Sequence, residues 1–267
     1  MKRILYLLPA VLLIGMSAFT SCVKKDPGKL VCGVTEYEPM NYRVDGEWTG
    51  FDTEFALLVG ERLGLEVEFK LIDWAQKFSE LNSGTIDAIW NGFTANTNES
   101  DGTPRINLCD MSYSYMLNTQ CVVIKKERTE EFTSISSLAG KTFAVESGSA
   151  GEAIAKSAAG ADGKIIGTPS QINTFIEVKS GAVDGAIIDV ILAKEILGSG
   201  DYTDLIIAAI NLKSEVYAIG FKKGNDLRDK VNQAIIELHE EGKIKEIAQK
   251  YKLENSLFID KNFGKAF

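Results

Sequence analysis

The sequence predicts an α/β fold with two lobes, in which two α/β sheets are joined by a two-strand hinge. Three observations lead to this prediction. The chain has 267 residues, more than one hydrophobic core usually organises. Short strand-like runs alternate with amphipathic helical runs, and this alternation occurs twice along the chain. Two extended segments connect the two occurrences, so we expect each occurrence to form one lobe.

The chain begins with the pattern of a secretory signal. Two basic residues precede an apolar run over residues 4–19, and Cys22 follows two small residues. The run is short for a membrane span, and no stop-transfer pattern follows it. We therefore predict a signal peptide over residues 1–21 and a polar tether over residues 22–29. A retained membrane anchor is the alternative.

The first α/β unit follows the tether. We expect strands at residues 30–34, 65–72 and 86–90, and helices at residues 53–63 and 74–82. The first of these helices has Phe55, Leu58, Val59 and Leu63 on one face, and Gly64 closes it. This βαβαβ order implies a parallel sheet with helices on both faces.

The second unit repeats the same order. Its strands are expected at residues 141–145, 164–167 and 186–188, and its helices at residues 151–159, 171–180 and 190–197. Segments 119–125 and 215–222 are predicted to be extended crossings, and two last helices, 226–241 and 243–251, return to the first unit. The predicted lobes are residues 30–120 with 220–267, and residues 121–219, with hinge crossings near 119–125 and 213–220. The carboxyl ends of the strands then face each other across a cleft that a ligand can close.

The composition excludes several classes of partner. The formal net charge is −8 and the chain has no basic cluster, which argues against binding to nucleic acid or to an anionic membrane surface. Cys32, Cys109 and Cys121 lack CxxC spacing and lie in or beside expected strands, so we interpret them as buried apolar residues, with one disulfide possible. A single histidine argues against a metal site and against a Ser-His or Cys-His nucleophile. No catalytic residue and no cofactor is expected.

Seven short motifs occur in a characteristic order. In the first lobe they are EYEPMNY, GEWTGFDTEFA, ELNSGTIDAI and DMSYSY, and in the second lobe LAGKTFAVESGSAGE, SGAVDGAIID and the returning VYAIGFKKGN. Over residues 29–251 the chain therefore resembles the extracytoplasmic solute-binding proteins of the polar amino acid family (family 3 type), which serve ABC importers. The resemblance implies a periplasmic-binding-protein fold of type II.

The resemblance also implies a function. It implies a monomeric extracytoplasmic receptor that binds a free L-amino acid between its lobes and delivers it to the permease of an ABC transporter. Cys22 resembles the lipidated cysteine of a bacterial lipobox. Lipidation there implies attachment to the membrane through the lipid alone, in the periplasm or on the outer face of the cell membrane.

Arg105 is the expected partner of the ligand carboxylate. It lies five residues before Asp110 of the DMSYSY motif, where the family has its binding arginine, and a guanidinium can hold a carboxylate through two parallel hydrogen bonds. The spacer 95–104 is several residues longer than in the family, which leaves a solvated loop arginine as the alternative. A longer loop costs little free energy, about 0.6 kcal/mol per doubling of its length.

Asp189 is expected to bind the ligand ammonium. It ends a strand of the second lobe and matches the family's ammonium-binding acid, although a helix N-cap is the alternative role. Thr94 is expected to offer its hydroxyl to the ammonium and its N–H to the carboxylate. The Gly92 carbonyl is expected to face the ammonium, with an ordinary strand-ending turn as the alternative. Three N–H groups at the start of a second-lobe helix are expected to close on the carboxylate, those of Ser149, Ala150 and Gly151.

The pocket for the ligand side chain is expected to come from Glu36, Tyr37, Trp74, Asn91 and Phe93. Trp74 starts a helix directly after a strand, which favours a place in the site. Glu36 is an acid in the first loop, where some relatives that bind cationic amino acids carry one, so the resemblance favours a cationic or polar ligand. The alternatives are that Glu36 faces solvent and that the aromatic side chains belong to the core.

Two other functions stay open. A few relatives of this fold are dehydratases or murein-cleaving enzymes, and such an enzyme needs a general acid or base in the cleft. Asp189 and Glu36 already have binding roles, and no further acid is expected on a cleft loop, which argues against an enzyme. A sensory or surface amino acid-binding protein has the same binding chemistry as a transport receptor, and the sequence alone does not separate them.

Overall fold

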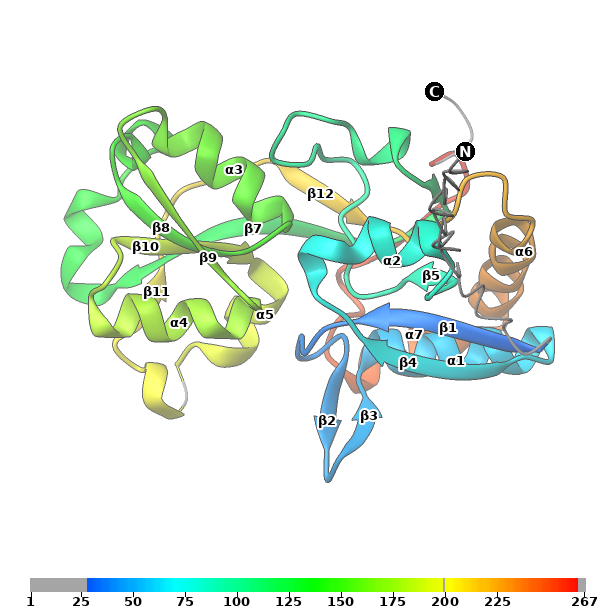
Figure 1. Cartoon of the computed structure of the whole chain (residues 1–267). Coiled ribbons are helices and arrows are strands. Elements are labelled where there is room, and N and C mark those ends of the chain that lie inside the picture. Colours follow the sequence, from blue (N-terminus) through cyan, green and yellow to red (C-terminus); the bar gives the residue numbers. More distant parts are fainter. Residues whose placement is uncertain (1–27, 199, 264–267) are drawn as a thin grey trace, which may run out of the picture.

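The protein folds into two α/β lobes that lie side by side (Figure 1). The computed structural model describes residues 28–198 and 200–263, so the predicted signal peptide and Cys22 lie outside the described residues. The long strand β7 (Ser114–Lys125) and the strand β12 (Ser214–Tyr217) run between the lobes. The first lobe contains both ends of the described chain, and the second lobe contains its middle.

The first lobe is built on a five-stranded sheet in the order β4-β1-β5-β13-β6. Its strands are β1 (Lys29–Val34), β4 (Glu66–Leu71), β5 (Ala88–Ile89), β6 (Asp110–Met111) and β13 (Gly220–Phe221). β1 runs parallel to β4 and β5, as the βαβαβ order predicts, whereas β13 is antiparallel to β5 and β6. The sheet is therefore mixed rather than parallel, because the returning β13 runs opposite to the other four strands.

Helices cover both faces of this sheet. On one face lie α1 (Phe51–Leu63), α6 (Leu227–Glu240) and α7 (Lys243–Lys250), and on the other lies α2 (Lys77–Ser83) after the short 3₁₀ helix η1 (Trp74–Gln76). Successive residues of β1 alternate between the two cores, since Leu30 and Cys32 pack with α1 and Val31 packs on the α2 side. The helix α1 ends at Gly64, as predicted, and this glycine has a left-handed φ of 67°.

The second lobe repeats this plan. Its sheet has the order β11-β7-β10-β8-β9, with β8 (Thr142–Glu146), β9 (Lys164–Thr168), β10 (Gly185–Asp189) and β11 (Leu205–Ile207). β8 is parallel to β9 and β10, and β7 is antiparallel to β10. The helix α3 (Ala150–Ala159) covers one face, and α4 (Gln171–Ser180) and α5 (Val190–Ile196) cover the other.

Several short elements were not predicted from the sequence. Besides the sheet strands β6 and β11, they are the hairpin β2 (Tyr42–Val44) and β3 (Glu47–Thr49), the strand β14 (Leu257–Asp260), and the 3₁₀ helices η2 (Arg105–Asn107), η3 (Lys126–Glu131), η4 (Ile135–Leu138) and η5 (Gly200–Tyr202). The hairpin projects from the first lobe (Figure 1). Each of these elements is too short to give a clear hydrophobic period.

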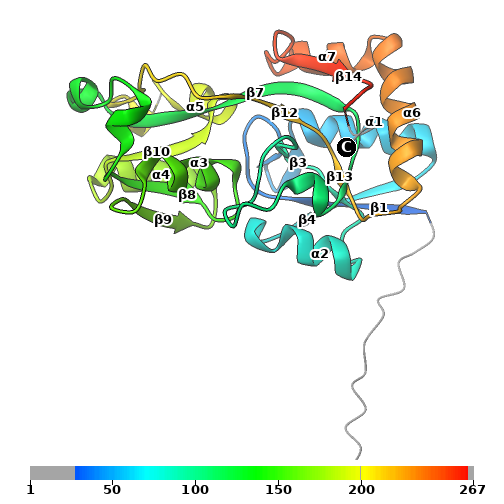
Figure 2. The same ribbon diagram turned by 90° about the horizontal axis from the view of Figure 1, so that it is seen from above.

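The two strands between the lobes form an antiparallel pair. Met116 lies opposite Tyr217, and Thr119 lies opposite Ser214. Further along, β7 pairs with β10 of the second lobe, while β14 pairs with the beginning of β7. Figure 2 shows β7 as one strand that extends from the first lobe into the second. Of the predicted hinge crossings, 213–220 overlaps this pair, whereas 119–125 meets it only at Thr119 and otherwise pairs with β10 and β11 of the second lobe.

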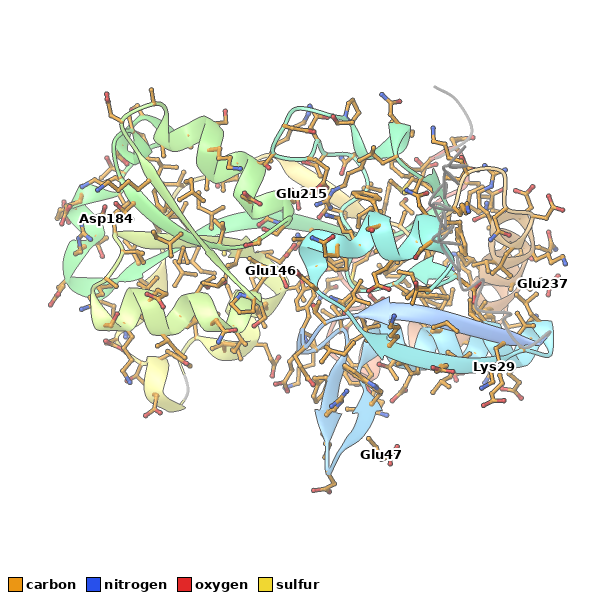
Figure 3. The ribbon with its side chains drawn as sticks, in the orientation of Figure 1. Lys29, Glu47, Glu146, Asp184, Glu215 and Glu237 are labelled. Carbon is orange, nitrogen blue, oxygen red and sulfur yellow. The ribbon has the colours of Figure 1, made fainter. Side chains whose placement is uncertain are left out.

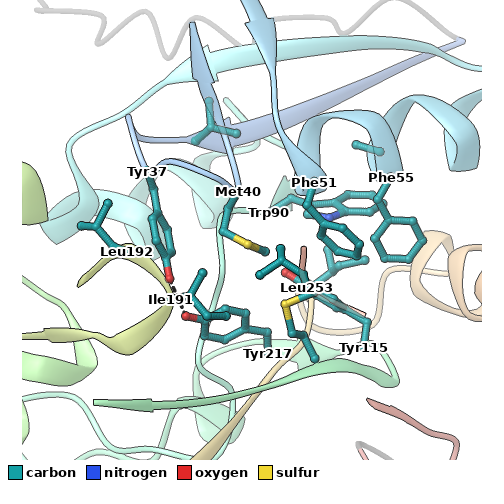
Figure 4. Packing of buried hydrophobic residues seen from close by; sticks show 14 of the residues in the cluster. Tyr37, Met40, Phe51, Phe55, Trp90, Tyr115, Ile191, Leu192, Tyr217 and Leu253 are labelled. Atoms are coloured by element: carbon teal, nitrogen blue, oxygen red, sulfur yellow. Dashed lines mark hydrogen bonds between the residues drawn. The ribbon is translucent and has the colours of Figure 1, made fainter. Parts of the chain in front are cut away.

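One apolar cluster continues from the first lobe into the second. Tyr37 and Met40 of the first lobe share it with Ile191 and Leu192 of α5 (Figure 4). The Tyr37 hydroxyl lies 2.6 Å from the Tyr217 hydroxyl within this cluster. On this side, therefore, burial of apolar surface adds to the two hinge strands in holding the lobes together.

The cysteines are buried, as predicted. Cys109 and Cys121 are buried free thiols, and Cys32 lies in the first-lobe core. Burial raises the pKa of Cys109 to about 12 and raises that of Cys121 as well. The described residues contain no helix that is long and apolar enough to cross a membrane and no cluster of three metal-ligating side chains.

Candidate functional site

The carboxyl ends of strands from both lobes converge on one small cavity. Ten residues line it: Trp74, Asn91, Gly92, Thr94 and Arg105 from the first lobe, and Glu146, Ser149, Ala150, Gln171 and Asp189 from the second. The lobes meet closely here, and the cavity has a volume of about 10 Å³. Sequence analysis predicted eight of these ten residues as ligand-binding residues, all except Glu146 and Gln171.

A larger groove of about 890 Å³ lies nearby, between residues 96–102 and the helix α3. We place the site in the smaller cavity for two reasons. Strand ends of both sheets meet there, which is where ligands bind in α/β folds. Its charged side chains are also buried, and buried charges at a lobe interface indicate binding chemistry more strongly than an open groove does.

Arg105 is almost fully buried, with 1% of its surface exposed. Its Nε donates to Glu99 at 2.6 Å, its Nη1 to the Thr94 carbonyl at 2.8 Å, and its Nη2 to the Gly148 carbonyl at 3.0 Å. The guanidinium also lies 4.9 Å from the centre of the Phe93 ring. The structure therefore excludes the alternative of a solvated loop arginine, because the longer spacer still brings Arg105 into the cavity.

The longer spacer also brings a carboxylate to the site. Glu99 of the segment 95–104 pairs with Arg105 and, at 3.0 Å, with the Nζ of Lys77. The Lys77 side chain is fully buried, and its Nζ donates to the Gly148 carbonyl at 2.8 Å. Burial and the neighbouring guanidinium lower the pKa of Lys77 to about 8. One carboxylate thus neutralises two buried cations, and both cations contact the second lobe through the same carbonyl group.

Asp189 lies at the end of β10 and is surrounded by hydrogen-bond donors. Its Oδ1 accepts from Gln120 at 2.9 Å, from the Tyr217 hydroxyl at 2.7 Å and from the amide of Asn118, and its Oδ2 accepts from Gln171. Burial raises the pKa of Asp189. The carboxylate makes no capping hydrogen bond to α5, so the helix-cap alternative is not what holds this side chain.

A second acid lies beside Asp189. Glu215 of the hinge strand β12 accepts hydrogen bonds from Thr94, Asn118 and Gln120 at 3.0–3.1 Å. Asn118 and Gln120 bridge the two acids, because side chains two residues apart on β7 point to the same face. Burial, with a contribution from Asp189, raises the pKa of Glu215 to about 7. Figure 3 shows Glu215 and Glu146 where the two lobes face each other.

Two structural features require glycine at position 92. Its φ of 55° is left-handed, and a Cβ there would lie 2.5 Å from Cε1 of Tyr37. The Gly92 N–H donates to the buried carboxylate of Asp52 at 2.6 Å. This anchors the turn after β5, which carries Asn91 and Thr94 into the cavity.

The N-terminus of α3 reaches the cavity from the second lobe. Ser149 is the N-cap residue, and its hydroxyl accepts a hydrogen bond from the Glu152 N–H at 3.1 Å. Ser149 and Ala150 line the cavity, where the positive end of the helix dipole favours an anion. Gly151 does not line it. A Cβ at that position would lie 2.3 Å from the Ile187 carbonyl oxygen, so Gly151 allows α3 to pack closely on β10.

Glu146 is a cavity residue that sequence reasoning missed. It is the last residue of β8, it is 3% exposed, and its Oε1 has no hydrogen-bond partner among the described residues. Burial, together with the charge of Asp189, raises the pKa of Glu146 to about 8. A carboxylate at a strand end, directly before a small-residue turn, was the available sequence signal. Gln171, the first residue of α4, gave no comparable signal.

Three further predicted residues lie outside the cavity. Glu36 is wrong as a pocket residue, because its side chain is 43% exposed and its carboxylate lies 3.6 Å from Nε of Arg43. Phe93 is fully buried beneath Arg105 and packs against Trp74 at a centroid distance of 6.0 Å. Tyr37 does not line the cavity, but its hydroxyl reaches the site through Tyr217.

No further acid was expected on a cleft loop, but two acids reach the lobe boundary from strands instead. Glu146 and Glu215 are both buried there, from sheet positions that the sequence did not mark as cleft loops. A shortage of acids at the lobe boundary is therefore no reason to exclude catalysis. The cavity places the buried guanidinium of Arg105, from the first lobe, opposite the buried carboxyl groups of Glu146 and Asp189, from the second. Such a site complements a small molecule that carries both charges.

Comparison with known proteins gives a consistent match. Residues 30–254 match the sequence profile of the bacterial extracellular solute-binding proteins, family 3. The chain is 32% identical over 261 residues to the probable amino-acid-binding protein YxeM of Bacillus subtilis (strain 168), covering 94% of this chain and 95% of that protein. It is 29% identical over 261 residues to the arginine-binding extracellular protein ArtP of the same organism, with coverages of 94% and 98%.

A solved structure is similar over most of the chain. It is the substrate-binding protein of an ABC uptake transporter from Streptococcus pneumoniae with bound histidine, with a TM-score of 0.73 and 31% identity. The superposition covers 84% of this chain and 92% of that one. The two-lobed arrangement is therefore shared along almost the whole described length.

Proposed function

The chain belongs to the family 3 bacterial extracellular solute-binding proteins, and from this premise we propose that it binds a free amino acid between its lobes and delivers it to the permease of an ABC transporter. The proposal treats the protein as a monomeric receptor rather than an enzyme. Relatives over nearly the full length are named as binding proteins, which supports this choice.

The observation that carries the proposal is the pair of opposite buried charges across the lobe boundary. Arg105 from the first lobe and Asp189 from the second line the same cavity. A free amino acid carries a carboxylate and an ammonium on one carbon, and both need charged partners once water is excluded. We assign the carboxylate to Arg105 and the N-terminus of α3, and the ammonium to Asp189 with the Thr94 hydroxyl.

Ligand entry requires the lobes to separate. In the structure Arg105 and Lys77 both donate across the boundary to the Gly148 carbonyl, and little free volume is left. We propose that the two lobes rotate about the hinge crossings near 119–125 and 213–220, and that the ligand stabilises the closed form that the permease recognises. Arg105 has five N–H groups, of which three donate to partners in the described chain, so others can reach a carboxylate.

A thermal-shift screen against the standard amino acids and ornithine tests the proposed function. We expect at least one L-amino acid to raise the melting temperature, since a ligand at 100 times its Kd adds about 2.7 kcal/mol to the free energy of unfolding. The N-acetyl and amide derivatives of that amino acid are the matched controls, because each lacks one of the two charges. A screen without any hit, or equal shifts from the controls, contradicts the proposal.

We further propose that Cys22 is lipidated and that the lipid holds the mature protein at the outer face of a membrane. Multiple acyl chains on one cysteine give stable attachment, whereas a soluble chain has no comparable affinity. The variant Cys22→Ser is therefore expected to move from the membrane fraction to the soluble extracytoplasmic fraction, as measured by fractionation and immunoblotting. The variant Cys109→Ser, which changes a buried thiol, is expected to stay with the membrane. Membrane retention of Cys22→Ser argues instead for a spanning signal.

A further inference from the structure

Glu146 is the charged residue of the cavity that the assigned contacts leave unused. The residue is 3% exposed and lines the cavity at the end of β8, and its Oε1 has no partner among the described residues. Leaving a carboxylate oxygen buried and unpaired is costly, and such groups are uncommon in folded proteins. The orphan oxygen therefore indicates that a donor belongs there.

Gln171, the side-chain hydrogen-bond partner of Glu146 in the cavity, leaves the Oε1 of Glu146 without a donor, and the neighbouring charged groups cannot supply one. Lys77 and Arg105 act on Glu146 through space, but both are held by Glu99 and by the Gly148 carbonyl. Asp189 carries the same charge as Glu146 and repels it. Burial and this repulsion raise the pKa of Glu146, and a cation placed beside the carboxylate acts in the opposite direction.

The position of Glu146 suits the side chain of the ligand. Asp189 and the first turn of α3, which the proposed function assigns to the ammonium and the carboxylate, line the same cavity from the second lobe, as Glu146 does. Trp74 lines the cavity from the first lobe and offers an aromatic surface. The other acid considered for this role, Glu36, is exposed and paired with Arg43.

We propose that Glu146 selects the side chain of the ligand and that the ligand is an amino acid whose side chain ends in a cation. This inference rests on the proposed function, because it takes the backbone charges of the ligand to be bound by Arg105 and Asp189. The side-chain cation takes the orphan oxygen of Glu146 as its partner, and the pair is buried when the lobes close. The ligand is then the missing member of a buried ion pair.

The experiment uses ligand pairs that match in shape and differ in side-chain charge. Isothermal titration calorimetry on the purified protein compares arginine with citrulline, and lysine with norleucine. We expect the wild-type protein to bind each cation about 100-fold more tightly than its neutral partner, the scale for leaving one member of a buried charge pair unpaired. In Glu146→Gln this preference should fall below about 10-fold, while citrulline binding changes by less than about 3-fold.

The variant Glu36→Gln is the matched control, since it removes an exposed acid of the first loop, and its preference for the cations should equal that of the wild type. Equal binding of arginine and citrulline by the wild type overturns the inference, and so does a Glu146→Gln variant that keeps the preference. Should that variant fail to fold, the wild-type ratio can still overturn the inference. Binding of neutral amino acids without preference overturns only this inference, whereas absence of binding by every amino acid overturns the proposed function as well.

Discussion

Replacing Arg105 with alanine is expected to abolish amino acid binding. The Arg105 guanidinium is the buried cation assigned to the ligand carboxylate. In the variant, the carboxylate of a bound amino acid would lie in the closed cavity without a cationic partner. We expect an affinity loss of more than about 100-fold, the scale found when one partner of a buried charge pair is removed. Isothermal titration calorimetry with the amino acid found in the screen measures the effect.

The Arg105→Ala variant retains part of the local ion pairing. Removal of Arg105 leaves Glu99 paired with Lys77, so the spacer 95–104 keeps one of its two ion pairs. The variant Arg105→Lys retains a charge but not the planar fork, and we expect intermediate binding. The control is Arg62→Ala, which removes an arginine that pairs on the surface with Glu237 and Glu241. Near-normal affinity in a folded Arg105→Ala protein would show that another group binds the carboxylate.

Asp189→Asn is expected to weaken amino acid binding by about 2–5 kcal/mol, because a buried ammonium loses its ionised partner. Asparagine can keep an acceptor at the Oδ1 position, which takes hydrogen bonds from Asn118, Gln120 and Tyr217. It loses the acceptor that faces Gln171. Calorimetric titration gives the affinity, and the melting temperature of the free variant shows separately how much the fold is affected.

Asp184→Asn is the matched control for this variant. Asp184 precedes the same strand, and its carboxylate accepts from the Thr142 N–H at 2.7 Å and pairs with Arg128 at 2.8 Å, away from the cavity. Its replacement should lower stability without changing affinity. If Asp189→Asn changes the binding free energy by less than about 1 kcal/mol, the ammonium has a different partner, and Glu215 becomes the first candidate.

The helices of the two α/β units were predictable because their signals are local. The apolar period of α1 and the glycine that ends it lie within one helix, and α4 was predicted at its observed bounds, Gln171–Ser180. The addition of β6 and of the antiparallel β13 to the sheet was not predictable in this way. β6 and β13 are two residues long, and their pairing depends on segments far apart in the sequence.

The same division applies to the candidate site. Arg105 and Asp189 were identified from their place relative to strands and motifs, and both line the cavity. Glu36 and Phe93 were misplaced, since a side chain in a loop or at a strand end can point to either face. Glu146 and Glu215 were missed, because an acid in a strand gives no sequence signal that it will be buried beside another acid.

The sequence by itself determined the order of the α/β units, the strand ends that carry polar residues, and the resemblance to a family, because periodicity, turn residues and motifs are read along the chain. Only the tertiary structure decided which charges are buried and which groups pair with them. The path of the spacer 95–104 brings Glu99 into ion pairs with Lys77 and Arg105. The Asn118 amide donates hydrogen bonds to both Asp189 and Glu215. Desolvation and Coulomb interaction depend on distance in space, and the raised pKa values of Asp189 and Glu215 arise from surroundings that distant segments create.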